Sequence, residues 1–230
     1  IGIAACERTG HTDTAADAPA DELEQQVMRG RQLVLASGCS DCHGGMGNTL
    51  AQDYLTGADE SEIVIDGRPV LPANLTPHAT TGIGRYTDRQ IFNALRYGLR
   101  PDATPDVVIT SETPGVGNYP AQPRYLAPTM PWMATRHLSE QQIHDIIAYL
   151  RHGVNAVEHA RPGNPVPPDG WASVFTAEAL VPVPAVAFPT ANEELADPAR
   201  RDQVLRGRQL VLAAGCGVCH GGGSNPAAQG

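Results

Sequence analysis

The chain has 230 residues, of which 41% are hydrophobic, so it can bury one full core and part of a second. Its formal net charge of −9 argues against a nucleic acid as partner and suits a partner protein with a basic docking face. No apolar run is long enough for a complete transmembrane helix.

The first segment, residues 1–22, predicts a flexible tether, because most of it is polar. Its opening stretch IGIAAC places apolar and small residues before Cys6, as at the end of a bacterial lipoprotein signal. A lipidated Cys6 would associate the protein with the outer side of the cytoplasmic membrane. A lipidated cysteine should be the first residue of the mature protein, so the residues before it count against this interpretation. The alternative is an unmodified cysteine near the terminus.

Residues 23–36 predict a helix that ends before Gly38. This helix leads into a C-x-x-C-H motif made of Cys39, Cys42 and His43. Two thiols at this spacing can bond the two vinyl groups of one porphyrin, and the adjacent histidine supplies the proximal nitrogen to its iron. The motif therefore predicts covalently attached haem c, with both cysteines bound to the porphyrin and the histidine bound to the iron.

Two more helices are predicted by their capping patterns. Thr87 followed by Gln90 is a capping-box pattern ahead of an apolar helix face. Ser139 followed by Gln142 is another, ahead of an apolar stripe with the spacing i, i+3, i+4, i+7 that ends before Gly153. Three helices joined by long loops predict an all-α haem domain.

The loops between these helices, residues 66–84 and 100–133, are rich in proline and glycine and show little strand alternation. Such segments predict extended chain wrapped around a large group. Because only 5% of the residues are aromatic, the haem itself would supply much of the large apolar surface. The side chains that we expect to line or back its pocket are Ile91, Phe92, Leu95, Tyr125, Trp132 and Ile147.

The sixth ligand of this haem should be a methionine from the second loop. Methionine opposite histidine raises the reduction potential and fills the coordination sphere, which favours electron transfer over oxygen chemistry. Met28 lies within the leading helix, and Met46 follows His43 too closely to reach the opposite face. Met130, in an extended loop before the last helix, is therefore the predicted ligand, with Met133 as the alternative.

Residues 154–198 contain many prolines and predict an extended linker that lies against the domains. After the linker, residues 203–222 repeat residues 26–45 at a constant offset of 177, with only four mismatches. Such a repeat indicates duplication rather than convergence. We therefore expect one haem domain at residues 23–153 and the opening, incomplete part of a second at residues 199–230.

The repeated segment contains a second C-x-x-C-H motif, formed by Cys216, Cys219 and His220. It predicts a second haem c, attached through both cysteines and bound to the iron by the histidine. No methionine or histidine follows His220. Either the sequence is part of a longer protein, which is the simplest explanation, or the sixth ligand comes from another chain or from a distant histidine. The distant candidates are His78, His137, His152 and His159.

Other interpretations of C-x-x-C are a thioredoxin-like redox pair, half of a zinc site and a structural disulfide. A redox pair would follow a strand, whereas both motifs here follow helical patterns. A four-cysteine zinc site could join the two pairs. The pairs lie far apart in the sequence, however, and each carries the adjacent histidine, so haem attachment is our prediction for both.

Two longer stretches, NLTPHATTGIGRYTDRQIFNALRYGLRPD and MPWMATRHLSEQQIHDIIAYLR, extend these motifs. With them, residues 23–153 resemble the class I cytochrome c domains of the multi-haem cytochrome c subunits of membrane-bound alcohol and sugar-acid dehydrogenases. The resemblance implies that Cys39 and Cys42 attach haem, that His43 is the proximal ligand and that Met130 is the distal ligand. The sequence departs from the family in an insert-like stretch at residues 106–119.

The predicted function is that of a di-haem or multi-haem c-type cytochrome on the periplasmic side of the membrane. It would be an electron-transfer protein rather than an enzyme. Its redox partners would be a dehydrogenase, an oxidase or other cytochromes, and a multi-subunit assembly with them is compatible with this role. One alternative is a structural, conducting subunit of a filament or of a large respiratory or photosynthetic complex, with the second haem completed by another chain. Another is a di-haem peroxidase, which needs an open iron site and a nearby acid or base.

Overall fold

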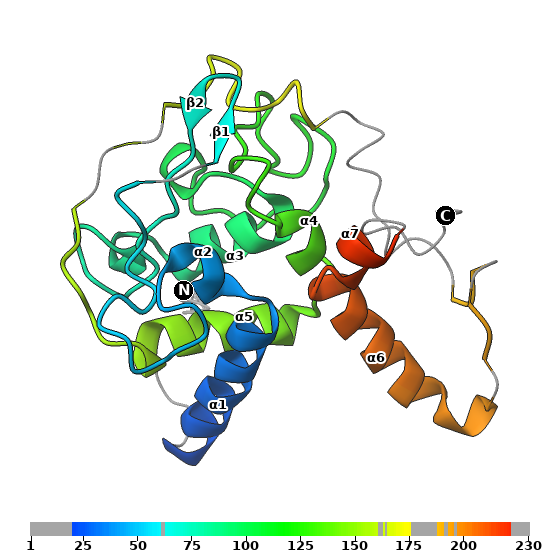
Figure 1. The fold of residues 1–230 in the computed structure, drawn as a ribbon. Helices are drawn as coiled ribbons and strands as arrows, with labels where there is room; N and C mark the ends of the chain where they lie inside the picture. Colours follow the sequence, from blue (N-terminus) through cyan, green and yellow to red (C-terminus); the bar gives the residue numbers. More distant parts are fainter. Residues whose placement is uncertain are drawn as a thin grey trace, which may run out of the picture.

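The computed structural model describes residues 20–60, 63–160, 163, 165–175, 188–190, 193–195 and 197–221 (Figure 1). Cys6 and most of the predicted tether lie outside these described residues. Within them, none of the helices has the length and apolar character needed to cross a membrane.

Helices make up nearly all of the regular structure in the described part of the chain, which confirms the predicted all-α class. The α-helices are α1 (Ala20–Ala36), α2 (Cys39–His43), α3 (Asp88–Tyr97), α4 (Trp132–Thr135), α5 (Glu140–Ala148), α6 (Arg201–Ala213) and α7 (Cys216–His220). The other helical turns are η1 (Ile83–Arg85), η2 (Pro101–Ala103), η3 (Tyr149–Gly153) and η5 (Pro198–Arg200). Two short strands, β1 (Val64–Ile65) and β2 (Arg68–Pro69), pair antiparallel.

Both predicted capping boxes are present. At the start of α3, Thr87 Oγ1 accepts a hydrogen bond from the Gln90 backbone N–H at 3.1 Å, and Gln90 Oε1 accepts one from the Thr87 N–H at 3.1 Å. Ser139 and Gln142 form the same pair of bonds at the start of α5. These bonds satisfy N–H groups that a helix leaves unpaired in its first turn, so they fix where the two helices begin.

The first domain is closed by direct contact between α1 and α5, which are far apart in the sequence. A Cβ atom on Gly30 would overlap the backbone carbonyl of Asp145, so the two helix backbones meet at this point. Beside this contact, Arg29 Nε and Nη2 donate to the Asp145 carboxylate at 2.9 and 3.0 Å. A glycine and an ion pair therefore fix how the first helix crosses the last helix of the domain.

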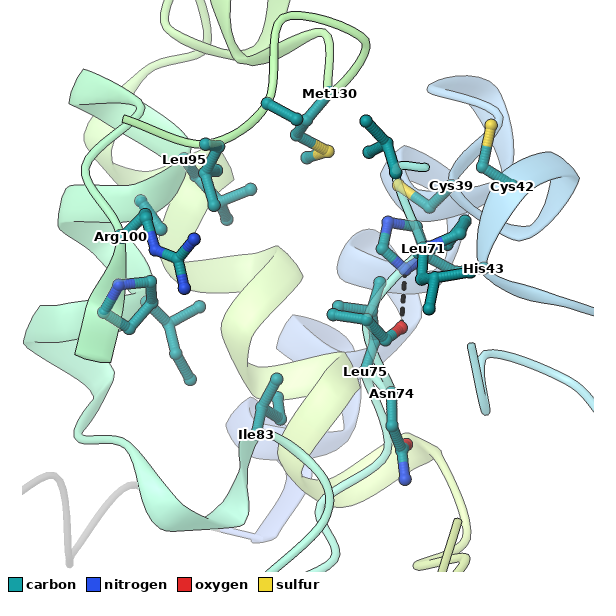
Figure 2. A pocket seen from close by; sticks show the side chains of 18 of the residues that line it. Cys39, Cys42, His43, Leu71, Asn74, Leu75, Ile83, Leu95, Arg100 and Met130 are labelled. Atoms are coloured by element: carbon teal, nitrogen blue, oxygen red, sulfur yellow. Dashed lines mark hydrogen bonds between the residues drawn. The ribbon is translucent and has the colours of Figure 1, made fainter. Parts of the chain in front are cut away.

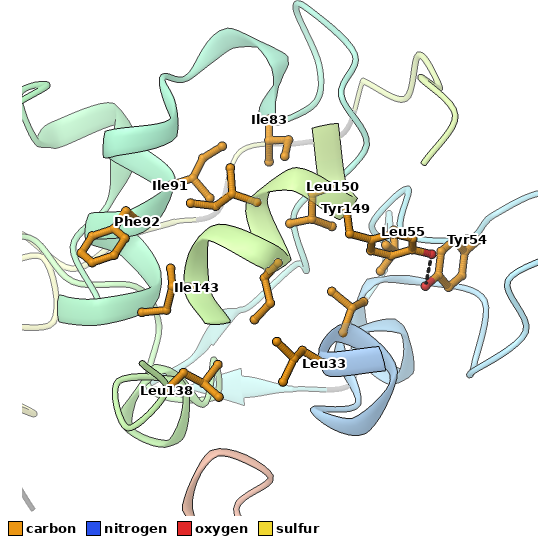
Figure 3. Close-up of a cluster of buried hydrophobic side chains, with 13 residues drawn as sticks. Leu33, Tyr54, Leu55, Ile83, Ile91, Phe92, Leu138, Ile143, Tyr149 and Leu150 are labelled. Carbon is orange, nitrogen blue, oxygen red and sulfur yellow. Dashed lines mark hydrogen bonds between the residues drawn. The ribbon is translucent and has the colours of Figure 1, made fainter. Parts of the chain in front are cut away.

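The main hydrophobic core lies where α1, α3 and α5 meet (Figure 3). Val34 of α1 and Ile143 of α5 are fully buried in it. Burying an aliphatic side chain of this kind contributes about 1.5–3 kcal/mol. At one edge, the hydroxyl groups of Tyr54 and Tyr149 form a hydrogen bond of 3.1 Å.

A second apolar cluster lies among the long loops and α4. The rings of Tyr125 and Trp132 stack there, with their centroids 5.9 Å apart. Trp171 is buried in the same cluster, although it belongs to the segment predicted as a linker. Part of residues 154–198 therefore packs against the first domain.

Candidate haem-binding site

A cavity of about 570 Å³ is lined by residues from α2, α3 and α5 and from the loops between them (Figure 2). Sites for small organic ligands and cofactors commonly have volumes of about 300–1,000 Å³ and mostly apolar walls. Here aliphatic side chains such as Leu71, Ile83 and Leu150 form much of the wall. The cavity therefore suits a large apolar group.

Of the six side chains expected to line or back the pocket, two line it and four lie in the two clusters around it. The lining pair is Ile91 and Leu95, both on α3. The four in the clusters are Phe92, Ile147, Tyr125 and Trp132. The three aromatic rings of this set thus lie behind the cavity wall, and the two aliphatic side chains on α3 form part of its surface.

His43 lies on the cavity wall and is 9% exposed. Its Nδ1 lies 2.7 Å from the carbonyl oxygen of Ala73. A carbonyl only accepts hydrogen bonds, so this contact places the ring proton on Nδ1 and leaves the lone pair on Nε2. A bond of this kind orients a histidine and fixes its tautomer for metal coordination. The ring of His43 is therefore prepared to bind iron through Nε2.

The two cysteines of the first motif line the same cavity as His43. Neither Cys39 nor Cys42 forms a disulfide in the described structure, which argues against a structural disulfide at this motif. Burial raises the pKa of the Cys39 thiol to about 11, so it is protonated at neutral pH. Within the described residues, no three or more His, Cys, Asp or Glu side chains are grouped to hold a metal ion.

Met130 lines the cavity from the loop before α4, and Figure 2 shows its side chain across the cavity from His43. The backbone here is tightly turned, because the Met130 N–H donates to Ala127 O at 2.9 Å and its carbonyl accepts from the Trp132 N–H at 2.8 Å. Met133 instead packs on the second cluster. The structure thus brings together His43 and the methionine that sequence analysis preferred.

The charged residues in the cavity wall, Arg85, Arg100 and Asp102, were not anticipated from the sequence. Arg100 lines the cavity and donates to the Asp102 carboxylate from Nε at 3.1 Å and Nη2 at 2.7 Å. These hydrogen bonds hold the pKa of Asp102 below its usual range. A guanidinium at the edge of an apolar cavity can pair with a carboxylate on a ligand. In the sequence, Arg100 stands out only because it precedes Pro101, a residue at which a helix cannot continue.

The segment after η3 also contributes to the cavity wall. His159, Val166 and Trp171 line the cavity. The segment is held down by His159, whose Nδ1 lies 2.9 Å from Thr56 O and whose Nε2 lies 2.9 Å from Asp59 Oδ1. The first part of the predicted linker therefore belongs to the site.

The second motif has the same backbone as the first but different surroundings. Gly215 precedes α7 with φ 65° and ψ 25°, and Gly38 precedes α2 with φ 64° and ψ 26°. Cys216 and His220 are exposed, whereas His43 is buried. The Cys219 side chain is not among the described ones. Among the described residues, the same local fold is therefore present in more exposed surroundings than at the first motif.

Of the distant histidines considered for the second haem, His137 is buried, and neither of its ring nitrogens has a partner among the described residues. His159 is bonded as described above, and His78 Nδ1 lies 2.9 Å from Thr81 Oγ1. His152 is exposed.

The residues around the cavity fit a haem. They provide apolar walls, two thiols beside an oriented histidine, a thioether sulfur on the opposite side and an arginine at the edge. A haem has one apolar macrocycle, two vinyl groups, an iron with two axial positions and two carboxylates, and each finds a chemically suitable partner here.

Comparison with known proteins gives the same result. The fructose dehydrogenase cytochrome subunit of Gluconobacter japonicus is 29% identical over 206 residues, which cover 88% of this chain and 36% of that protein. The cytochrome c subunit of the quinone alcohol dehydrogenase of Gluconobacter oxydans (strain 621H) is 30% identical over 209 residues, covering 87% and 36%. The gluconate 2-dehydrogenase cytochrome c subunit of Pantoea cypripedii is 28% identical over 203 residues, covering 84% and 37%.

The chain thus spans just over a third of the length of these relatives. Their names confirm the resemblance to cytochrome c subunits of alcohol and sugar-acid dehydrogenases. The family model for cytochrome c matches residues 27–153, from α1 to the end of η3 and including the whole first motif. This chain belongs to the cytochrome c family, whose members carry covalently bound haem c.

Proposed function

We propose that this chain is an electron-transferring cytochrome c unit of a membrane-bound dehydrogenase, located on the periplasmic side. The observation that carries the proposal is the cavity with His43 on one wall and Met130 across from it. Histidine and methionine together hold iron in both oxidation states, so electron transfer needs no change of ligand.

In the first domain, Cys39 and Cys42 attach the haem, His43 is the proximal ligand and Met130 is the distal ligand. Haem c supplies one-electron redox chemistry when bound. The residues of this chain control the orientation and the surroundings of the haem. The bond from His43 to Ala73 O orients the imidazole, and the aliphatic wall excludes water, which favours a higher reduction potential. Arg100 is placed to orient the carboxylates of the group.

The second motif supports a di-haem or multi-haem protein. Cys216, Cys219 and His220 would attach and ligate a second haem c, because α6 and α7 repeat the sequence of α1 and α2 and α7 repeats the backbone of α2. The domain division that follows is residues 23–153, 154–198 and 199–230, after a tether at residues 1–22. Residues of the linker that line the first cavity belong functionally to the first domain.

The proposed periplasmic location follows from the covalent modifications proposed for this chain. Covalent haem attachment and a lipidated Cys6 would both place the protein outside the cytoplasmic membrane. The named relatives belong to fructose, alcohol and gluconate dehydrogenases, so an organic alcohol or sugar acid is the expected original electron donor, oxidised by a separate subunit.

The proposal is tested by following the haem absorbance of this protein in membranes of its own host. Fructose, ethanol or gluconate is added under anaerobic conditions, and hydrogen peroxide in a separate experiment. Reduction of the haem by one of the three substrates, without peroxide turnover, is expected. Peroxide turnover without any reduction by substrates would instead support a di-haem peroxidase. A Met133→Ala variant should behave as the wild type in both experiments, because Met133 lies outside the cavity.

A further inference from the structure

Two large apolar side chains on the loop after the first C-x-x-C-H motif are open to solvent. Met46 is 77% exposed and Leu50 is 91% exposed, the highest values among the large hydrophobic residues that the structure describes. Single exposed apolar residues are ordinary on protein surfaces, whereas exposed apolar residues that gather in one place are typical of an interaction site. The segment that carries both, residues 46–50, is called the Met46 loop below.

The backbone of the Met46 loop is held in a conformation that does not favour methionine. Met46 has φ 46°, in the left-handed region where glycine is the preferred residue. Buried Ser40 fixes this turn, because its carbonyl accepts from the Met46 N–H at 3.2 Å and its Oγ accepts from the Gly47 N–H at 3.0 Å. Further along the loop, Arg31 Nη2 donates to Thr49 Oγ1 at 3.2 Å. The structure therefore keeps Met46 at the surface despite an unfavourable backbone conformation.

The internal repeat shows that the motif does not need these apolar side chains. At the offset of 177, Met46 corresponds to Gly223 and Leu50 to Ala227. Positions 48, 51 and 52 carry the same residues as positions 225, 228 and 229, so the correspondence continues through the loop. The large apolar residues are thus present in one copy of a duplicated segment and replaced by small residues in the other.

The residues that hold the Met46 loop differ between the two copies as well. Ser40 corresponds to Gly217, and Thr49 corresponds to Pro226. Neither glycine nor proline has a hydroxyl group, so the second copy cannot form either side-chain hydrogen bond. Four differences therefore act together, two in the exposed apolar residues and two in the groups that fix their backbone. Such a set indicates a function of this loop that is specific to the first haem site.

The Met46 loop lies where the first haem site reaches the surface. Cys42 lines the cavity and is also exposed, so a haem attached to it has an edge close to solvent. The hydrogen bonds from the loop to Ser40 tie it to α2, the helix that carries Cys42 and His43. Electron transfer between proteins is fastest where the edges of two redox groups come closest. A protein bound to the Met46 loop would therefore be well placed to exchange electrons with the first haem.

The exposed charges beside the loop indicate the chemistry of its partner. Asp41 precedes the loop on α2 and Asp53 follows it, and both are exposed. The whole chain has a formal net charge of −9. A second copy of the chain or an anionic lipid surface would bring further negative charge to this place, which is unfavourable. A protein surface with an apolar centre and a rim of Lys or Arg complements both the apolar and the acidic residues.

We propose that the Met46 loop is the docking surface for a redox protein with such a basic-rimmed apolar surface. One electron passes between the redox group of that protein and the first haem, so one of the two groups is oxidised as the other is reduced. Met46 and Leu50 form the apolar centre of the contact, and Asp41 and Asp53 contribute to its rim. The inference rests on the proposed electron-transfer function and names the surface through which it operates.

The first test uses the haem-loaded protein at its natural length in membranes of its own host. In Met46→Gly/Leu50→Ala, the loop receives the residues of the repeat. Haem reduction by fructose, ethanol or gluconate is followed without oxygen, and haem reoxidation is followed after oxygen is added. We expect one of the two rates to fall about tenfold, as on loss of a central interface contact. The rate that falls shows whether the docked protein is the electron donor or the acceptor.

Two controls separate docking from damage to the haem site. Oxidation by ferricyanide, which needs no docked protein, should keep its wild-type rate, and the thermal unfolding midpoint should be unchanged or higher, because glycine suits the backbone at position 46. Met28→Ala, at an exposed position on α1, should leave both membrane rates unchanged. Wild-type rates in the double variant would overturn the proposal. A lower midpoint or an equal slowing with ferricyanide would also overturn it, since either would assign the two side chains a structural role.

A second measurement tests whether the loop is covered by another protein. Leu50→Cys is labelled with a maleimide under native conditions, once in the purified haem-loaded chain and once in membranes, relative to Met28→Cys and with the wild-type labelling of Cys6 subtracted. Fast labelling at position 50 in the purified chain and slow labelling in membranes are expected. Fast labelling in both would contradict the proposal. Slow labelling in both would do so too, because the same polypeptide or a second copy would then cover the loop.

Failure of this proposal can be distinguished from failure of the proposed function in the same membranes. A wild-type haem that none of the three substrates reduces would contradict the proposed function, and the docking surface with it. A wild-type haem that is reduced and reoxidised normally, together with unchanged rates in Met46→Gly/Leu50→Ala, would contradict the docking surface alone.

Discussion

The two C-x-x-C-H segments have almost the same backbone conformation but different surroundings. Helices α2 and α7 start from glycines with almost the same φ and ψ. Among the described residues, α3, α5 and the long loops pack around α2 and leave a cavity beside it, whereas Cys216 and His220 of α7 are exposed. The comparison teaches that the motif determines its own backbone, while the haem site depends on partners spread along the chain from Ile63 to Trp171.

The largest effect on the stability of the first domain is expected from disrupting the contact between α1 and α5. In Gly30→Val, the branched side chain would occupy the position of the Asp145 backbone, so the two helices must separate. We expect a loss of about 4–5 kcal/mol in the free energy of unfolding of the first domain, at the upper end for single substitutions. Denaturant unfolding followed by circular dichroism measures it. A wild-type midpoint would mean that α1 does not pack on α5 as described.

A cavity-forming substitution on the same helix should have the next largest effect. Leu33→Ala removes a side chain that is 9% exposed, and we expect a loss of about 3 kcal/mol. Met28→Ala, at a position 53% exposed on the same helix, should change the free energy of unfolding by less than about 0.5 kcal/mol. Equal effects of the two substitutions would contradict the assigned orientation of α1.

The junction between the first domain and α6 should make the protein sensitive to acid. Burial, together with Arg136, Arg208 and Arg96, lowers the pKa of His137 to about 4. Its unfolded pKa is near 6.5, so the unfolded chain takes up a proton that the folded protein does not bind between these two values. The stability from neutral His137 is therefore complete above pH 6.5 and decreases as the pH falls towards 4.

His137→Leu should remove this part of the pH dependence, about 2 kcal/mol between pH 6.5 and pH 4.5. Urea unfolding at several pH values measures the slope, with His152→Leu, at an exposed position, as the control. If His137→Leu keeps the full acid slope, then His137 is not buried beside α6.

The smallest expected effect lies at the edge of the cavity. The hydrogen bonds from Arg100 lower the pKa of Asp102, so this pair stabilises the fold above the unfolded pKa of the aspartate and is lost as the pH falls through the folded one. Because the Asp102 side chain is 50% exposed, Asp102→Asn should cost less than about 1 kcal/mol at pH 7 and nothing at pH 2. A loss that is the same at both pH values would show that the ion pair is not its cause.

The helices α1, α3 and α5, the caps of α3 and α5 and the first motif could be predicted from the sequence, because each depends on local spacing, whereas α4 was not predicted. Thr87 and Ser139 mark helix starts through neighbours three residues away. Met130, preferred over Met133, lies in the cavity wall, although the backbone there is tightly turned rather than extended.

Other parts of the site could not be predicted, because long-range packing forms them. Trp171 and His159 line the cavity from a proline-rich segment that has no periodicity to indicate burial. Phe92 and Trp132 were predicted to line or back the pocket, and their rings lie behind its wall in the two clusters.

The most direct test of the central claim is Met130→Ala in the haem-loaded protein, with Met133→Ala as the matched control. If Met130 is the distal ligand, its removal leaves the haem attached, abolishes the visible-spectrum signature of methionine ligation at the first haem and lets that haem bind carbon monoxide. Met133→Ala should keep the wild-type spectrum and stay closed to carbon monoxide. An unchanged spectrum in Met130→Ala would contradict the account and assign the ligand to Met133 or to a histidine.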